Sequence, residues 1–217
     1  MTETSRLTAV RASYDAVAAD YARLLGTALA EGPLDRAMLA AFAEYVRGEE
    51  GGGGRAVADL GCGPGRVTAH LDALGVRTFG VDLSPAMVAV ARRTYPGLRF
   101  EVGSMTALDV ADGVLGGVLA WYSTVHTPPS ELPPVFAEFA RVLAPGGYAL
   151  VAFEAGDEQI RLEHAYGHPV DLDVYGTPPD RIAALLAGAG LAEVARLVRE
   201  PDGYERSAQG LLLARKA

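Results

Sequence analysis

The sequence has a single cysteine, Cys62, and a single lysine, Lys216. One cysteine excludes an intrachain disulfide framework and a cysteine-rich zinc site. No apolar run approaches the roughly 20 residues of a membrane-spanning helix. Residues 1–7 are polar and lack the apolar stretch of a secretory signal. We therefore expect a cytoplasmic protein with no membrane partner.

Acidic residues outnumber basic ones, with 27 Asp and Glu against 19 Lys and Arg and a formal net charge of −8. Affinity for nucleic acid comes mostly from cations that meet phosphates, so we expect no nucleic-acid partner. Half of the 217 residues are hydrophobic and 21% are charged. This composition excludes a disordered chain and is sufficient for the core of one domain.

The first third of the chain favours helices. A second helix is predicted from Pro33, and a glycine-rich connector follows at residues 48–54. Apolar and aromatic side chains recur at helical spacing in the first helix: Val10, Tyr14, Val17 and Tyr21. From residue 56 on, short apolar strands alternate with helices. This alternation predicts parallel βαβ units with helices on both faces of a sheet.

The boundaries of the later elements come from short local signals. Ser84 before Pro85 predicts a helix start. Thr177-Pro-Pro-Asp180 predicts a capping box that opens another helix. The two last strands are separated by a turn too short for a helical crossover, so they should pair antiparallel. The strands are expected at residues 56–60, 78–82, 98–102, 118–122, 148–153, 191–198 and 210–214.

A glycine-rich loop, Gly61-Cys-Gly63-Pro-Gly65, stands where an apolar strand turns into a helix. Glycines let the backbone pass close to a ligand, and the helix N-terminus behind them offers free N–H groups. Asp82 ends the next strand, and a carboxylate at that position is able to accept both hydroxyls of a ribose. Loop and acid together predict a nucleoside-containing cofactor.

Two other phosphate-binding patterns fail at this loop. The dinucleotide fingerprint requires glycine or alanine where Arg66 stands, and a P-loop requires a lysine that the loop lacks. A nicotinamide-dependent oxidoreductase remains an alternative because it would share the sheet and the ribose acid. A non-catalytic cofactor-binding regulator is a second alternative.

The motifs resemble those of the class I S-adenosylmethionine-dependent methyltransferases. Residues 57–65 look like the family's first motif, residues 80–87 like its second, and residues 143–147 match a third landmark. The resemblance implies a three-layer α/β/α fold with a seven-stranded, mostly parallel sheet. The last strand would be inserted antiparallel, and a helical preface would precede the sheet. It also implies S-adenosyl-L-methionine as the cofactor and S-adenosyl-L-homocysteine as its product.

The resemblance further implies which residues surround this cofactor. Gly61, Gly63 and Gly65 would approach its methionine portion, with Asp59 near the ammonium and Asp82 on the ribose. Many members carry an acid at the adenine edge, and this chain has Ser104 there. The remaining cofactor residues would be Leu83, Met87 and Met105 around the adenine, and Tyr14 and Tyr21 on a helix over the cofactor.

The end of the fourth predicted strand should lie beside the transferred methyl group. We expect Trp121 or Tyr122 to border the sulfonium, since aromatic faces suit a cation. His126 is the candidate base because imidazole titrates near neutral pH, and Tyr122 is the second candidate catalytic residue. Acceptor-binding residues are predicted in an insertion at residues 157–175: Arg161, His164, His168 and Tyr175. The spacing of the two histidines would suit a metal, but Gly167 and Pro169 interrupt a helix there, so no metal is expected.

We interpret the chain as a single methyltransferase domain, residues 1–217. Its parts would be a helical preface or lid (1–50), a cofactor-binding core (56–155), a substrate-pocket insertion (156–176), and a C-terminal helix and hairpin (177–217). The predicted reaction transfers a methyl group to oxygen or nitrogen of a small molecule. The protein would work as a monomer or homodimer.

Overall fold

A computed structural model of the chain describes residues 3–27, 29, 32–48, 54–203 and 205–217. Seven strands form one sheet in the order β3-β2-β1-β4-β5-β9-β8, and β6 and β7 form a separate two-stranded sheet. The main strands are β1 (Val57–Leu60), β2 (Thr78–Asp82), β3 (Arg99–Val102), β4 (Leu115–Trp121), β5 (Leu143–Glu154), β8 (Leu191–Arg199) and β9 (Gln209–Lys216). The small sheet is β6 (Gln159–Ala165) and β7 (His168–Tyr175).

The central strands are buried on both faces. Every residue of β1 and of β4 is buried, as expected for parallel strands covered by helices on both sides. All neighbouring pairs from β3 to β5 run parallel, whereas β9 pairs antiparallel with both β5 and β8. The seven-stranded sheet with one inserted antiparallel strand confirms the predicted fold.

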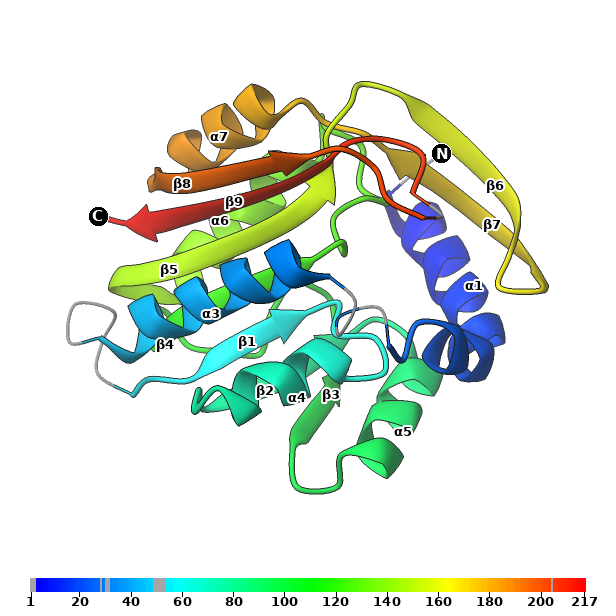
Figure 1. Cartoon of the computed structure of the whole chain (residues 1–217), viewed down its shortest axis with the longest axis horizontal. Helices are drawn as coiled ribbons and strands as arrows, with labels where there is room; N and C mark the ends of the chain where they lie inside the picture. The colour runs from blue at the N-terminus through cyan, green and yellow to red at the C-terminus, as the bar shows by residue number, and fades with distance from the viewer. Residues whose placement is uncertain (1–2, 28, 30–31, 49–53, 204) are drawn as a thin grey trace.

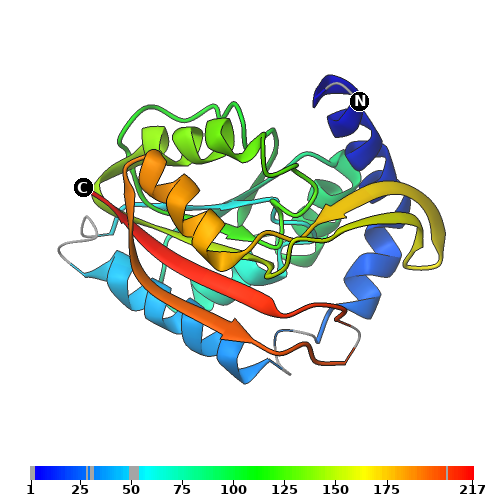
Figure 2. The same ribbon diagram turned by 90° about the horizontal axis from the view of Figure 1, so that it is seen from above.

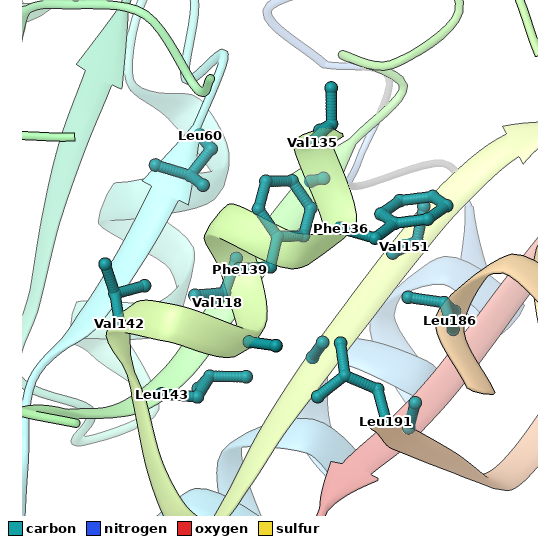
Figure 3. Close-up of a cluster of buried hydrophobic side chains, with 14 of the residues drawn as sticks. Leu60, Val118, Val135, Phe136, Phe139, Val142, Leu143, Val151, Leu186 and Leu191 are labelled. Atoms are coloured by element: carbon teal, nitrogen blue, oxygen red, sulfur yellow. The ribbon is translucent and has the colours of Figure 1, made fainter. Parts of the chain in front are cut away.

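Helices cover the two faces of the sheet and make a three-layer sandwich (Figures 1 and 2). One face carries α3, α4 and α5, and the other carries α6 and α7. In the larger core, Phe136 and Phe139 of α6 pack edge to face with ring centroids 5.7 Å apart (Figure 3). The helices are α1 (Glu3–Leu24), α3 (Pro33–Arg47), α4 (Arg66–Ala73), α5 (Pro85–Thr94), α6 (Leu132–Val142) and α7 (Pro179–Gly188).

The predicted helix starts differ in their outcome. Pro33 begins α3, and the Ser84 side chain accepts a hydrogen bond from the Met87 N–H at 3.1 Å before Pro85 begins α5, so both predictions are confirmed. The capping box at Thr177 is wrong. The residue before α7 is Pro178, whose side chain offers no acceptor, and Asp180 instead accepts from Arg196 at 2.6 Å. The predicted connector at residues 48–54 lies for the most part outside the described residues.

Helix α1 and the β6–β7 hairpin stand together beside the carboxyl ends of the parallel strands (Figures 1 and 2). The hairpin occupies most of the predicted insertion. It turns at Tyr166 and Gly167, whose φ angles of 55° and 86° give the doubly left-handed turn that matches strand twist. The Asp171 N–H donates to the Ser13 hydroxyl at 2.9 Å, which attaches β7 to α1. Together they form a wall over the sheet edge where α/β folds bind ligands.

Candidate cofactor and acceptor site

A cavity with about 890 Å³ of empty space, part of it open to solvent, lies between α1 and the carboxyl ends of β1 to β4. The cavity lies where the strand order reverses between β1 and β4, the usual ligand position in an open α/β sheet. Its walls include twelve of the predicted residues: Tyr14, Tyr21, Gly61, Gly63, Asp82, Leu83, Met87, Ser104, Met105, Trp121, Tyr122 and His126.

The loop after β1 presents bare backbone to this cavity. Gly63 has a φ of 54°, and a Cβ atom there would meet only the Tyr21 ring, at 3.9 Å, so a side chain would project into the empty space. Gly65 serves packing instead. A Cβ atom on it would lie 2.7 Å from the Phe100 ring, and Gly65 is not among the residues that line the cavity. A Cβ atom on Gly61 would clash with the Ser123 Cβ, so Gly61 also serves packing, and the space for close approach of a ligand is at Gly63.

Asp82 lies at the end of β2 with its carboxylate fixed by the backbone. Its Oδ2 accepts from the Gly63 N–H at 2.7 Å, and its Oδ1 accepts from the Ser84 N–H at 2.8 Å. A carboxylate has about four acceptor positions, so two remain for hydroxyl donors in the cavity. Burial raises the pKa of Asp82, and the two N–H bonds act in the opposite direction. This arrangement fits a ribose.

The loop after β3 forms the next part of the wall. The Ser104 and Thr106 hydroxyls lie 2.8 Å apart and hydrogen bond to each other, and both residues line the cavity. Thr106 was not predicted, although its hydroxyl stands two positions beyond the expected adenine-edge residue. Leu83, Met87 and Met105 supply apolar surface, so a flat aromatic base would meet both apolar faces and hydroxyl groups here.

Three side chains at the end of β4 complete the wall near the glycine loop. The Trp121 and Tyr122 rings meet edge to face, with centroids 5.6 Å apart. Tyr122 has a left-handed φ of 52°, and burial raises the pKa of its hydroxyl, with Asp35 acting in the same direction. Ser123, which sequence analysis missed, lines the cavity beside Gly61. Its buried hydroxyl oxygen lacks a hydrogen-bond partner among the described residues. An unpartnered hydroxyl beside the glycine loop fits a polar ligand at this position.

His126 and Tyr14 meet across the cavity wall. The Tyr14 hydroxyl lies 2.7 Å from His126 Nε2, and His126 Nδ1 lies 2.7 Å from the backbone carbonyl oxygen of Asp173. Burial lowers the pKa of His126. Burial also raises the pKa of Tyr14, and Tyr21 adds to this effect. The ring of His126 thus joins α1, the loop after β4 and strand β7.

Asp59 is not among the cavity-lining residues. Its carboxyl group is buried beneath the glycine loop, where Oδ2 accepts from the Thr68 hydroxyl at 2.6 Å and Oδ1 has no partner in the described part of the chain. Burial raises the pKa of Asp59 to about 7. The predicted contact with a cofactor ammonium therefore stays a prediction.

The four predicted acceptor residues lie on the hairpin, outside the residues that line the cavity. The Arg161 guanidinium pairs with the Asp171 and Asp173 carboxylates of the neighbouring strand. His168 Nε2 donates to Asp20 of α1 at 2.8 Å. His164 is exposed, and the Tyr175 N–H donates to the Val125 carbonyl at 2.8 Å. Within the described ranges, no cluster of three His, Cys, Asp or Glu side chains could hold a metal ion.

Two residues of α1 that sequence analysis missed hold this helix over the cavity. The Arg6 guanidinium donates to the His126 carbonyl at 3.1 Å and pairs with Glu131. The Asp15 carboxylate accepts from the Ser84 hydroxyl and the Ala86 N–H. Neither residue had a recognisable partner in the sequence, because the contacts join positions more than 68 residues apart.

Comparison with known proteins identifies the domain. Residues 57–147 match a family model described as a methyltransferase domain. This part of the chain, from β1 into β5, is similar to the methyltransferase domain of that family. A malonyl-[acyl-carrier protein] O-methyltransferase from Erwinia billingiae is 31% identical over 55% of this chain and 46% of that protein. A trans-aconitate 2-methyltransferase from Methylobacterium nodulans is 36% identical over 61% of this chain and 48% of that protein. The chain thus spans about half the length of these curated relatives.

Solved structures confirm the class I methyltransferase fold. A 1,6-didemethyltoxoflavin-N1-methyltransferase from Burkholderia thailandensis, crystallised with S-adenosylhomocysteine, aligns with a TM-score of 0.73 at 20% identity. The alignment covers 100% of this chain and 91% of that one. A magnesium protoporphyrin IX methyltransferase from Synechocystis, crystallised with S-adenosylmethionine, aligns with a TM-score of 0.72 at 16% identity. This alignment covers 98% of this chain and 97% of that one.

Proposed function

We propose that the protein is an S-adenosylmethionine-dependent methyltransferase that acts on oxygen or nitrogen of a small molecule. The proposal depends on one observation: three groups with complementary chemistry line the same cavity. They are the bare loop at Gly61 and Gly63, the Asp82 carboxylate and the Tyr14–His126 pair. Curated relatives that share the domain are named as methyltransferases with different acceptors, so the donor is supported more strongly than the acceptor.

The residues present suit this donor. Asp82 retains acceptor positions for ribose hydroxyls, and Ser104 and Thr106, whose hydroxyls bond to each other, line the part of the cavity where we expect the adenine. The unpartnered Ser123 hydroxyl and the open backbone at Gly63 lie where the methionine portion would bind. When bound, S-adenosylmethionine supplies an electrophilic methyl group on a sulfonium. The chain would position the acceptor against it and exclude water.

Two further properties belong to the same proposal. We expect the protein to act in the cytoplasm as a monomer or homodimer, without a nucleic-acid partner, consistent with its net charge of −8. Among the described residues, no helix has the length and apolar character needed to cross a bilayer.

Calorimetry with S-adenosylhomocysteine tests the cofactor assignment directly. We expect one binding site per chain and a rise in the midpoint of thermal unfolding, because ligand that binds only the folded state stabilises it. A folded protein that gives neither response would contradict the proposal. Release of S-adenosylhomocysteine from S-adenosylmethionine across a panel of small hydroxyl and amine compounds then tests transfer. Binding without any release would favour a non-catalytic regulator.

A further inference from the structure

The hydrogen-bond geometry assigns the proton positions of the Tyr14–His126 pair. The Asp173 carbonyl oxygen only accepts, so His126 Nδ1, 2.7 Å away, must carry a hydrogen. Burial lowers the pKa of His126 and thus favours the neutral ring, and the Arg6 guanidinium acts in the same direction. In the neutral ring, Nε2 is then the atom with the free lone pair, and the Tyr14 hydroxyl donates to it at 2.7 Å.

Each element that packs against the Tyr14–His126 pair contributes charged or titratable groups. Arg6 of α1 is bound to Glu131 and to the His126 backbone, and Asp173 of β7 is paired with Arg161. Tyr21, Tyr166 and Asp82 face Tyr14 and raise its pKa together with burial. Tyr14 therefore stays a phenol near neutral pH. The Tyr14 hydroxyl can accept a proton only if it donates its own proton at the same time. His126 Nε2 is positioned to accept that proton.

We propose that Tyr14 and His126 form a proton relay, with Tyr14 as the group that meets the acceptor, and that the methylated atom of the acceptor is a hydroxyl oxygen or a nitrogen that carries hydrogen. This inference rests on the proposed methyltransferase function. The acceptor atom bonds to the methyl carbon, and the pair of electrons in the broken carbon–sulfur bond stays on sulfur. The acceptor proton moves to the Tyr14 oxygen while the Tyr14 proton moves to His126 Nε2. The positive charge of the sulfonium is thus conserved on the imidazolium, which still donates to the Asp173 carbonyl.

A carboxylate acceptor would not use this relay, because it has no proton to lose. It would instead seek a cation. Arg6 and Arg11 line the cavity; the Arg6 terminal nitrogens are bound to Glu131 and the His126 carbonyl, and its buried Nε has no hydrogen-bond partner among the described residues. The half-exposed Arg11 side chain lies 3.8 Å from the Asp15 carboxylate. The preference for an acceptor that carries a proton therefore rests on the contact between the Tyr14 hydroxyl and His126 Nε2.

The test uses the full chain with S-adenosylmethionine and a matched set of probe acceptors: catechol, aniline and benzoate. We expect methylation of catechol or aniline and none of benzoate. Tyr14→Phe should lower kcat for the proton-bearing probe by about 10²–10³ at pH 7, within the range of general acid–base catalysis. For catechol, the loss should shrink as the pH approaches the pKa of the phenol, because the acceptor then ionises without the relay. Tyr45→Phe on α3, remote from the cavity wall, is the control and should retain the wild-type kcat.

Two measurements separate the possible failures. Tyr14→Phe keeps the aromatic ring over the cavity and removes only the hydroxyl, so it should bind S-adenosylhomocysteine within a few-fold of wild type. A wild-type protein that does not bind S-adenosylhomocysteine would contradict the methyltransferase proposal itself. Nitrogen-15 spectra of the loaded wild-type protein should show hydrogen on His126 Nδ1 and none on Nε2. Four results would each overturn the relay. The first two are hydrogen on His126 Nε2 and exclusive methylation of benzoate. The others are no turnover of any proton-bearing probe by protein that binds the donor, and a Tyr14→Phe kcat equal to wild type at every pH.

Discussion

Asp15 of α1 accepts a hydrogen bond from the Ser84 hydroxyl at 2.6 Å, and the same carboxylate oxygen accepts from the Ala86 N–H at 3.0 Å. Ser84 is also the residue that caps α5. A carboxylate at the N-terminus of a helix is stabilised by the free N–H groups and the helix dipole. The Asp15 carboxylate thus helps to cap the N-terminus of α5 and attaches α1 above the cofactor cavity.

Asp15→Ala should destabilise the fold and loosen α1. We expect the free energy of unfolding in urea to fall by about 1–2 kcal/mol, as for loss of a helix cap. The affinity for S-adenosylhomocysteine should also fall, because Tyr14 and Tyr21 reach the cavity from the same helix. Asp109→Ala is the control, since its exposed carboxylate has no hydrogen-bond or ion-pair partner in the described part of the chain. Equal stability of the two variants would contradict the capping role.

Asp82→Ala should weaken cofactor binding, and it should also destabilise the fold because the Gly63 and Ser84 N–H groups lose their acceptor. Each hydrogen bond to a charged group contributes roughly 1.5–3 kcal/mol, so loss of one ribose contact corresponds to about a tenfold or greater rise in Kd. Asp82→Asn keeps one carbonyl acceptor and should lie between Ala and wild type. Calorimetry with S-adenosylhomocysteine provides the three values. An exposed acid of α4, Asp72, serves as the Ala control, and identical Kd values for Asp82→Ala and wild type would remove the ribose assignment.

The parts of the fold that depend on local chemistry were predictable from the sequence. The strand at 78–82 has the predicted bounds, and the Ser84 cap forms as expected. The prediction of a capping box was wrong. Thr177 and Asp180 have the right spacing, but the backbone places Pro178 at the N-cap position. Local patterns do not report which residue adopts the cap geometry.

The parts of the site that depend on long-range contacts were not predictable. His126 was identified as a titratable group near the sheet edge, but its partners Tyr14 and Asp173 lie 112 and 47 residues away along the chain. The insertion at 157–175 is recognisable because it replaces the compact connection expected between the fifth strand and the next helix. Its ion pairs, Arg161 with Asp171 and Asp173, are cross-strand contacts that require the register of β6 and β7. Side-chain roles therefore followed from topology, which the sequence predicted only at the level of the strands.

Arg6 should contribute to stability far more than another arginine of the same helix. Its guanidinium is largely buried, bound to the His126 carbonyl and to Glu131. Arg6→Ala leaves that carbonyl without its charged donor, so the free energy of unfolding should fall by roughly 1.5–3 kcal/mol. Arg23 pairs with Asp20 on the exposed surface, and Arg23→Ala should cost at most about 0.5 kcal/mol. Urea unfolding of both variants at the same pH measures the difference. Similar decreases in the free energy of unfolding would argue against a structural role for the Arg6 contacts.

Asp59 should make the fold less stable as the pH rises from 5 to 8. Burial raises its pKa to about 7 in the folded protein, whereas the ordinary value is 3.8. Between these two values the folded state binds more protons than the unfolded state, so rising pH favours unfolding. With 1.36 kcal/mol per pKa unit, the loss from pH 5 to pH 8 is roughly 2–3 kcal/mol. Asp59→Asn keeps an acceptor for the Thr68 hydroxyl but has no proton to lose, so its stability should fall less over this interval. Asp72→Asn should retain the wild-type pH profile; a wild-type profile in Asp59→Asn as well would show that Asp59 is not the group that titrates.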